Sequence, residues 1–376
     1  MSKYRICFIG PFSPYKGGIA QYDDFLAQEL LKRSDLYCIS YKRQYPGFLI
    51  NNRSQFSSEI EKNQLINNNN IEFSIDSVNP LTYISALKKI IKFKPDLVIL
   101  PWWVIYWAPM YKFLLFMLRR YKIKSLLVCH NIYEHEDGYF KKFISNNVLK
   151  MSDYFILHSE SEKNKLVKIV KGKKIIKHLL PVYGFSEPQL CTRSKKNSNT
   201  LNLLYFGFVR KYKGLDLLLD AIRILDNKNI YLTIVGEFWE GEYEYTNYID
   251  SHKLQNITII NRYVESSEIE DYFEDCDAVV LPYRSATGSA VIATAYGYHK
   301  PVIVTNVGGL PDAVADGKTG IVVEPDSVSI AEGIDIFITS KDKLDYGEEI
   351  KKFVLSYMSW TSMADEIYKV IENNEK

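Results

Sequence analysis

The chain has 376 residues, of which 47% are hydrophobic and 24% are charged. This composition is typical of a soluble globular protein and excludes a disordered or fibrous chain, and the length favours two domains over one. The longest apolar segments fall short of the ~18 residues that a membrane span needs, and the amino terminus "MSKYRICFIG" has no cleavage-like site. We therefore expect a cytoplasmic protein.

The net charge of +2 conceals two halves of opposite sign. Residues 1–185 contain 28 Lys and Arg against 15 Asp and Glu, a net charge of +13, whereas residues 186–376 contain 19 against 30, a net charge of −11. The basic first half suits an anionic surface or substrate. Mixed surface charge that keeps the protein soluble explains the same asymmetry.

The five cysteines are far apart, lack CxxC spacing and mostly lie in apolar runs: Cys7, Cys38, Cys129, Cys191 and Cys276. This pattern indicates a reducing compartment and argues against a disulfide framework or a zinc site.

Apolar runs alternate with helical patterns in the first half of the chain. Their hydrophobicity is continuous rather than alternating, which indicates strands covered on both faces, so we predict a parallel sheet with crossover helices such as 19–33 and 85–93. The predicted strands are Tyr4–Gly10, Asp96–Trp103, Lys124–Ile132, Asp153–Ser159 and Ile175–Val182. The Asn-rich stretch Asn63–Phe73 is predicted to be a surface loop.

A second series of strands and helices begins at residue 201, after the polar stretch 186–200, which we predict to be a linker. Its predicted strands are Leu201–Val209, Tyr231–Phe238, Asn256–Val264, Asp277–Tyr283, Lys300–Thr305 and Gly320–Pro325. The fold class is therefore α/β, with two Rossmann-like doubly wound domains, 1–185 and 201–355. Because such sheets bind ligands beyond the carboxyl ends of their strands, we expect the site in a cleft between the two domains.

Two stretches that follow predicted strands have residues that can bind an anion. Gly17 and Gly18 precede a predicted helix, so backbone N–H groups there can approach a phosphate, although an unliganded Gly-Gly turn has the same sequence. Arg210 and Lys213 lie three residues apart at a predicted helix start, where they can neutralise a diphosphate. Solvated surface charges are the alternative, although cations at a helix start oppose its dipole.

A third stretch, "LLVCHNIYEHED", places His130 directly after a predicted strand. A histidine there can donate a hydrogen bond or act as an acid or base, and His135 and Glu136 add polar groups. A structural histidine at a strand end is the alternative.

Together these motifs resemble the family-4 retaining glycosyltransferases of the GT-B fold. The resemblance covers nearly the whole chain, in the family's order: "GPFSPYKGGIAQY", "LLVCHNIYEHE", "FGFVRKYKGLDLLLDAI", "IVGEF" and the long stretch from Asp277 to Pro325. It implies that residues 356–376 form a carboxyl-terminal helix that crosses back to the first domain. It also implies transfer of a sugar from a nucleoside diphosphate sugar, with retention and without a metal or other cofactor.

Carried over by position, the resemblance assigns the leaving diphosphate to Arg210 and Lys213, the transferred sugar to His130, and the acceptor to His135 and Glu136. The implied donor-binding residues are Gly17, Gly18, Gly236, Arg262, Tyr263, Val264, Thr287, Gly288, Ser289, Ala290, Val291 and Thr294.

The chain departs from the family between Leu281 and Gly309, where it has no Asp or Glu. Most members have two glutamates here, eight positions apart, for the sugar and the ribose; Ala286 and Thr294 occupy those places. Either this is a subgroup in which hydroxyls and backbone amides hold the donor, with Thr294 on the ribose, or activity has been lost. Loss of a charged hydrogen bond costs about 1.5–3 kcal/mol, which lowers affinity without removing the chemistry, so we favour the first explanation.

Residues 101–124, "PWWVIYWAPMYKFLLFMLRRYKIK", join three tryptophans to an apolar run and a basic end. An interfacial segment on an anionic membrane and a buried helix with a basic end both fit. The first reading predicts a lipid-linked acceptor and a role in cell-surface polysaccharide synthesis at the inner face of the membrane. The function predicted overall is glycosyl transfer. The alternative is an inactive homologue that binds sugar nucleotide or glycan in an assembly complex, and the acid-free stretch argues against an epimerase.

Overall fold

The computed structural model describes residues 4–47, 55–56, 70–133, 138–183, 200–225, 229–265 and 268–373. The chain divides into two compact units: unit 1 comprises Met1–His178 and Trp360–Lys376, and unit 2 comprises Leu179–Ser359. The first boundary thus falls seven residues before the predicted limit of 185, and the second falls four residues after the predicted limit of 355. The predicted linker, apart from Thr200, lies outside the described residues.

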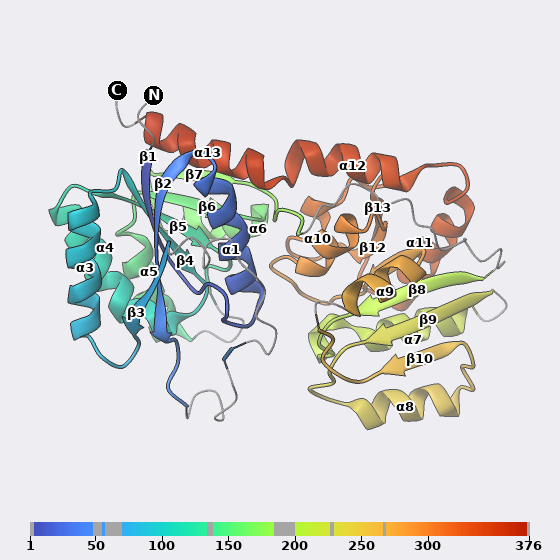
Figure 1. Ribbon diagram of the computed structural model, residues 1–376. Helices are drawn as coiled ribbons and strands as arrows, with labels where there is room; N and C mark the ends of the chain where they lie inside the picture. Colours follow the sequence, from blue (N-terminus) through green and yellow to red (C-terminus); the bar gives the residue numbers. More distant parts are fainter. Residues whose placement is uncertain are drawn as a thin grey trace. The chain divides into compact units, whose positions relative to one another are not determined.

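Unit 1 contains a seven-stranded parallel sheet in the order β3-β2-β1-β4-β5-β6-β7 (Figure 1). Its central strand β4 is buried along its whole length, as continuous hydrophobicity predicts for a strand covered on both faces. The strands are β1 Tyr4–Ile9, β2 Ser34–Arg43, β3 Ile71–Asp76, β4 Leu97–Trp102, β5 Lys124–Cys129, β6 Tyr154–Leu157 and β7 Lys174–Lys177.

The sequence pattern missed β2 and β3, and the predicted loop Asn63–Phe73 was wrong at its end, because β3 begins at Ile71; residues 63–69 lie outside the described part of the chain. Strand β3 is at the sheet edge and pairs only with β2, so most of its residues are partly exposed and its apolar run is short.

The helices of unit 1 are the crossovers between these strands, together with a carboxyl-terminal helix. They are α1 Gly18–Leu31, α3 Leu81–Phe93, α4 Ala108–Arg120, α5 Tyr139–Leu149, α6 Glu160–Val167 and α13 Trp360–Glu372. Helix α13 packs on α1, where the Tyr368 hydroxyl donates to the Leu30 carbonyl at 3.0 Å. The last 17 residues of the chain therefore belong to the same unit as its first strand.

Unit 2 contains a six-stranded parallel sheet in the order β10-β9-β8-β11-β12-β13. The strands are β8 Leu201–Phe206, β9 Ile230–Val235, β10 Ile257–Ile260, β11 Ala278–Leu281, β12 Val302–Thr305 and β13 Gly320–Val323. The helices are α7 Leu215–Ile224, α8 Glu242–Ser251, α9 Ile269–Asp275, α10 Ala290–Gly297, α11 Ser327–Ser340 and α12 Tyr346–Tyr357. The predicted class, two Rossmann-like α/β domains, is confirmed.

Residues 101–124 form the end of β4, helix α4 and the start of β5. Trp102 and Trp107 are only 2% and 1% exposed. These two rings belong to the core, so the buried-helix alternative holds for them, whereas Trp103 is half-buried. In the part of the chain that the structure describes, no helix has the length and apolar character of a membrane span.

Candidate functional site

The basic pair predicted from the sequence lies at the carboxyl end of β8. Arg210 precedes a single 3₁₀ turn, Lys211–Lys213, which ends at Gly214 with φ 65°. A Cβ on Gly214 would lie 2.0 Å from the Pro282 carbonyl oxygen, so only glycine lets this turn pack against the end of β11. The turn places the Lys213 ammonium beside Gly207, directly after β8. A Cβ added to Gly207 would lie 3.2 Å from the Lys213 Nζ.

Neither Arg210 nor Lys213 forms an ion pair with a carboxylate among the described residues. The nearby acid Asp216, in the first turn of α7, is engaged by Arg284 in a bidentate pair with N–O distances of 2.7 and 2.5 Å. Two cations without a protein counter-ion are costly unless an anion binds them. This arrangement therefore suits an anionic ligand.

Burial, and then the charge of Arg210, lower the pKa of Lys213 to about 8. The Lys213 ammonium also lies 5.4 Å from the centre of the Tyr283 ring. A bound anion would favour the charged ammonium and raise this pKa again.

Arg210 stacks on an aromatic group that the sequence did not point to. Its guanidinium carbon lies 3.9 Å from the centre of the Trp239 ring, a cation–π geometry. Trp239 in turn contacts Phe208, with ring centres 5.1 Å apart, and Phe208 contacts Tyr263 at 6.3 Å. The three rings follow β8, β9 and β10, and each is at least one-third exposed.

Helix α10 begins beside this pair with a capped amino terminus. The Ser289 hydroxyl accepts from the Val291 N–H at 3.2 Å, and the Val291 side chain, like the Lys213 ammonium, lies next to Gly207. An anion is favoured at such a terminus. The neighbouring predicted residues Thr287, Gly288 and Ala290 are half-buried or exposed.

Thr294 lies one turn into α10 and is half-buried. Its hydroxyl donates to the Ala290 carbonyl at 3.0 Å, which leaves the oxygen able to accept a hydrogen bond from a ligand.

The remaining donor residues predicted in unit 2 lie in different surroundings. Gly236 has φ 147°, and a Cβ there would lie 2.2 Å from the Gly207 carbonyl oxygen, so it keeps β8 and β9 close at their ends. Arg262 is engaged by Glu268 in a bidentate pair at 2.7 and 2.5 Å. Tyr263 is half-exposed, whereas Val264 packs into the core.

In unit 1, the predicted glycine pair is exposed at the start of α1, with Gly17 at φ 109°. Asp24, the seventh residue of that helix, accepts from the Ser13 N–H at 3.2 Å and from the Ser13 hydroxyl at 2.5 Å. The loop before the glycines is thereby tied to the helix after them. The neighbouring Asp23 is buried, and its carboxylate has no hydrogen-bond partner among the described residues; burial raises its pKa well above the usual value.

His130 directly follows β5 and is half-buried, but its Nε2 atom is inaccessible and has no hydrogen-bond partner within the part of the chain that the structure describes. Burial, and then neighbouring His158, lower the pKa of His130 to about 3, so the ring is neutral near pH 7. His158 follows β6 in the same way, and its ring centre is 5.8 Å from that of His130. Predicted residues His135 and Glu136 lie outside the described residues.

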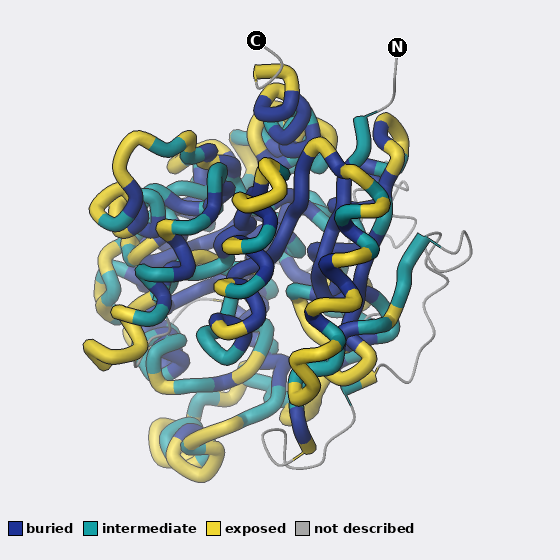
Figure 2. Tube along the Cα trace, turned by 90° about the vertical axis from the view of Figure 1, so that its left-hand side faces the viewer, coloured by how far each residue is buried: buried dark blue, intermediate teal, exposed yellow. Residues whose placement is uncertain are grey.

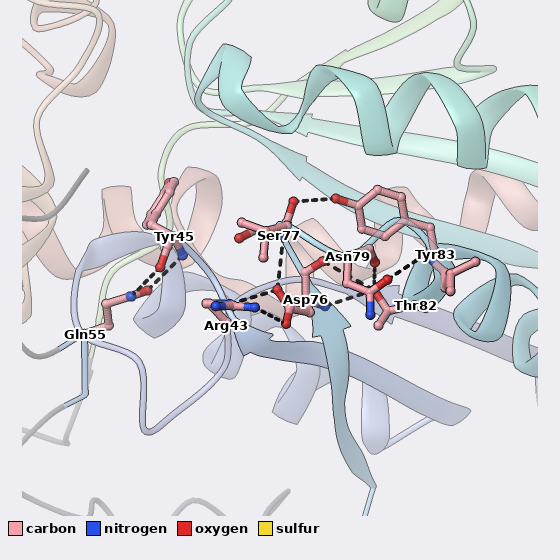
Figure 3. Close-up of polar contacts among 10 residues, drawn as sticks. Arg43, Tyr45, Gln55, Asp76, Ser77, Asn79, Thr82 and Tyr83 are labelled. Atoms are coloured by element: carbon pink, nitrogen blue, oxygen red, sulfur yellow. Dashed lines mark hydrogen bonds and ion pairs between the residues drawn. The ribbon is translucent and has the colours of Figure 1, made fainter. Parts of the chain in front are cut away.

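A polar network joins the carboxyl ends of β2 and β3, at the edge of the sheet where β5 and β6 also end (Figure 3). Arg43 forms a bidentate pair with Asp76 at 2.9 and 2.6 Å. The side-chain amide of Gln55 exchanges two hydrogen bonds with the Tyr45 backbone. The main-chain carbonyl of Gln55 accepts a hydrogen bond from the Lys16 N–H at 2.8 Å. Arg43 is thus neutralised within the protein, unlike Arg210.

Within the described ranges, no group of three or more His, Cys, Asp or Glu side chains is arranged to hold a metal ion. Cys7, Cys38, Cys129 and Cys276 are buried free thiols.

Comparison with known proteins identifies the family to which most of unit 2 is similar. Residues 189–353 match the family described as "Glycosyl transferases group 1". The basic pair, Trp239 and α10 all lie within this match. The match spans less than half of the chain and includes none of the predicted unit 1 residues.

Several curated relatives are named as glycosyltransferases. "Uncharacterized glycosyltransferase MJ1178" of Methanocaldococcus jannaschii is 28% identical over 237 residues, 62% of each protein. "Lipopolysaccharide 1,2-N-acetylglucosaminetransferase" of Salmonella typhimurium is 26% identical over 182 residues, 46% of this chain and 48% of the relative. The chain spans about 60% of the length of the first curated relatives that it matches.

Solved glycosyltransferases share the fold over the whole chain. A glycosyltransferase from Rickettsia africae has a TM-score of 0.72 at 21% identity and covers 100% of each chain. Anabaena HepE, solved with UDP-glucose, has a TM-score of 0.71 at 16% identity and covers 98% of this chain and 99% of its own. The two Rossmann-like domains are therefore those of a GT-B fold.

Proposed function

We propose that the protein is a retaining glycosyltransferase that transfers a sugar from a nucleoside diphosphate sugar to a glycan acceptor, without a metal ion. The observation that supports this most is the Arg210–Lys213 pair, which has no carboxylate partner among the described residues and adjoins the amino terminus of α10. A leaving diphosphate gains negative charge as its bond to the sugar breaks. Two cations and a helix terminus in a partly buried site stabilise that charge.

In the proposed reaction, the bond between the sugar C1 and the diphosphate oxygen breaks while a bond forms from C1 to an acceptor hydroxyl oxygen on the same face. The acceptor proton passes to the departing phosphate oxygen, so the protein supplies no nucleophile. Lys213 and Arg210 bind the leaving diphosphate, and Gly17 and Gly18 contribute N–H groups to the phosphates. We assign to neutral His130 a hydrogen bond with the transferred sugar.

The family relationships support the substrate classes. Anabaena HepE binds UDP-glucose, and the Salmonella relative is named for sugar transfer to lipopolysaccharide. We therefore propose a uridine diphosphate sugar as donor and a lipid-linked glycan as acceptor, in cell-surface polysaccharide synthesis. A lipid-linked acceptor requires contact with the cytoplasmic face of a membrane.

The second candidate is a sugar-nucleotide-binding protein without turnover. It is favoured by Ala286 and Thr294, which stand where most family-4 members have glutamates. The two candidates differ in whether donor is consumed.

Thermal stabilisation by UDP, GDP and ADP, and by their sugars, tests the proposal. A ligand at 100 times its dissociation constant adds about 2.7 kcal/mol to the free energy of unfolding, so the cognate nucleotide should raise the melting temperature clearly. Donor hydrolysis or transfer to a lipid-linked acceptor then separates the enzyme from the binding protein. Absence of stabilisation by every nucleotide would overturn both candidates.

Thr294→Val should weaken nucleotide binding about fivefold, because one neutral hydrogen bond to the ribose contributes about 1 kcal/mol. Thr294→Ser keeps the hydroxyl and is the matched control. Isothermal titration calorimetry with the cognate nucleoside diphosphate measures both. Equal affinities for Thr294→Val and the parent protein would mean that another residue holds the ribose.

A further inference from the structure

Three adjacent strands of unit 1 are each followed by a histidine. His130 follows β5, His158 follows β6 and His178 follows β7, and the parallel register of these strands brings the three residues to the same level at the carboxyl end of the sheet. Strands β5 and β6 are buried toward this end, and buried residues are dark blue in Figure 2. The imidazole centres of His130 and His158 are 5.8 Å apart. Backbone pairing therefore places His158 beside the histidine that the proposed mechanism uses.

A backbone carbonyl decides which nitrogen of His158 carries hydrogen. The His158 Nδ1 atom lies 2.8 Å from the His178 carbonyl oxygen, and because a carbonyl can only accept, Nδ1 must donate. Burial lowers the pKa of His158 to about 4, so near pH 7 the ring is neutral and has a single N–H. The ring lone pair of His158 is therefore at Nε2. That atom is inaccessible and has no hydrogen-bond partner among the described residues.

Helices α1 and α13 enclose the two rings. Tyr22 on α1 is fully buried, and its ring centre lies 4.7 Å from that of His130 and 5.3 Å from that of His158. The Tyr22 hydroxyl donates to the Met363 sulfur on α13 at 3.1 Å. On the same helix, the Ser362 hydroxyl lies 2.7 Å from the His178 Nε2 atom. In an enclosed site of this kind, interactions between polar groups are stronger than in water.

The lone pair of His158 acts on His130, whose Nε2 atom is enclosed in the same way. That atom is also inaccessible and without a hydrogen-bond partner in the described ranges, and the His130 ring is neutral near pH 7. With hydrogen on Nε2, the N–H dipole of His130 is attracted by the His158 lone pair across the gap between the rings. With hydrogen on Nδ1, two lone pairs would share the enclosed space. The low local dielectric therefore favours the first tautomer.

We propose that His158 is a positioning residue for His130. Its lone pair holds His130 in the tautomer with hydrogen on Nε2, so that the Nδ1 lone pair of His130 accepts a hydrogen bond from a hydroxyl of the transferred sugar. Only Nδ1 can meet a ligand, because Nε2 is inaccessible. This inference rests on the proposed function, in which neutral His130 contacts the sugar, and it gives that contact a direction: the sugar donates and the protein accepts.

Long-range ¹H–¹⁵N NMR of the full-length protein with ¹⁵N-labelled histidine tests the tautomers without any ligand. In the parent protein, His130 should carry hydrogen on Nε2 and His158 on Nδ1; loss of signals in His130→Phe assigns the first ring. His158→Phe keeps a ring but removes the lone pair, so the share of His130 with hydrogen on Nδ1 should rise. His158→Gln, whose amide oxygen can accept, should restore the parental tautomer.

Transfer kinetics with the cognate donor give a second measurement. His158→Phe should lower kcat about fivefold, the effect of one neutral hydrogen bond, whereas His158→Gln should recover most of the rate. Affinity for the nucleoside diphosphate should not change, because His130 contacts the sugar. Ser362→Ala is the matched control: it removes the contact with His178 from the same cluster and should lower the melting temperature without changing kcat or the His130 tautomer.

Two results would overturn the proposal. One is a parent His130 ring with hydrogen on Nδ1, or a tautomer that is the same in the parent and in His158→Phe. The other is an equal loss of kcat in His158→Phe and Ser362→Ala, which would make the role of His158 structural. Because the NMR measurement needs no substrate, a parent protein with the expected tautomers but no sugar transfer would contradict the proposed function alone.

Discussion

Lys213→Met should reduce glycosyl transfer by about two to three orders of magnitude and, at the same time, stabilise the folded protein at pH 7. The loss of turnover follows because removing one preorganised charge at a developing anion costs about 10²–10³ in kcat. Initial rates with the cognate donor measure the first effect, and thermal unfolding in the absence of nucleotide measures the second.

The stabilisation follows from the sign of the pKa shift. Burial and the charge of Arg210 lower the pKa of Lys213 from 10.5 to about 8, so folding disfavours the ammonium. This cost to the free energy of folding is fully present below about pH 8 and disappears above about pH 10.5. Each pKa unit corresponds to about 1.4 kcal/mol, and partial solvation of the ammonium reduces the gain to roughly 1–2 kcal/mol.

The same pKa predicts the pH dependence of the parent enzyme. With Lys213 uncharged above about pH 8, kcat/KM should fall as pH rises through that value. Bound diphosphate raises the pKa, so kcat should persist to higher pH than kcat/KM.

Lys211→Met is the matched control, because Lys211 lies in the same 3₁₀ turn but is exposed. It should change neither turnover nor stability at pH 7. A Lys213→Met enzyme with near-parental kcat would remove Lys213 from the mechanism. Unchanged stability would mean that the ammonium is better solvated than its position next to Gly207 indicates.

Trp239→Ala should lower kcat about tenfold or more, because the indole ring positions the guanidinium of Arg210. That guanidinium lies 3.9 Å from the ring centre and has no carboxylate partner within the described residues. A cation–π contact of this kind contributes about 1–2 kcal/mol. Trp239→Phe keeps an aromatic face and should retain most of the activity.

A double-mutant cycle separates positioning from a general structural role. If Trp239 acts through Arg210, then Trp239→Ala should have little further effect in an Arg210→Ala background. Tyr243→Ala, at an exposed aromatic residue on α8, is the control for loss of surface area. Additive losses in the double mutant would show that Trp239 acts independently of Arg210.

The strands that the sequence predicted well are those buried on both faces. The run around β4 predicted a central strand because all six of its residues lie in the core. Strand β3 was missed because an edge strand is half-exposed, and its residues continue an Asn-rich stretch. The tryptophans of 101–124 show a second limit of sequence-based prediction. Their pattern fits both a buried core and a membrane interface, and only the packing of the fold shows that Trp102 and Trp107 are buried.

The sequence alone determined the α/β class, the two series of strands and the basic pair, because hydrophobic period and residue spacing are local properties of the chain. Tertiary structure decided which charges are left without partners. Arg284 pairs with Asp216, 68 residues away in the sequence, and Arg262 pairs with Glu268. The Arg210 guanidinium instead stacks on the Trp239 ring, and the Lys213 ammonium lies beside Gly207. Charge pairing depends on distances of a few ångströms between side chains, some of them on segments remote in sequence, and folding alone sets those distances.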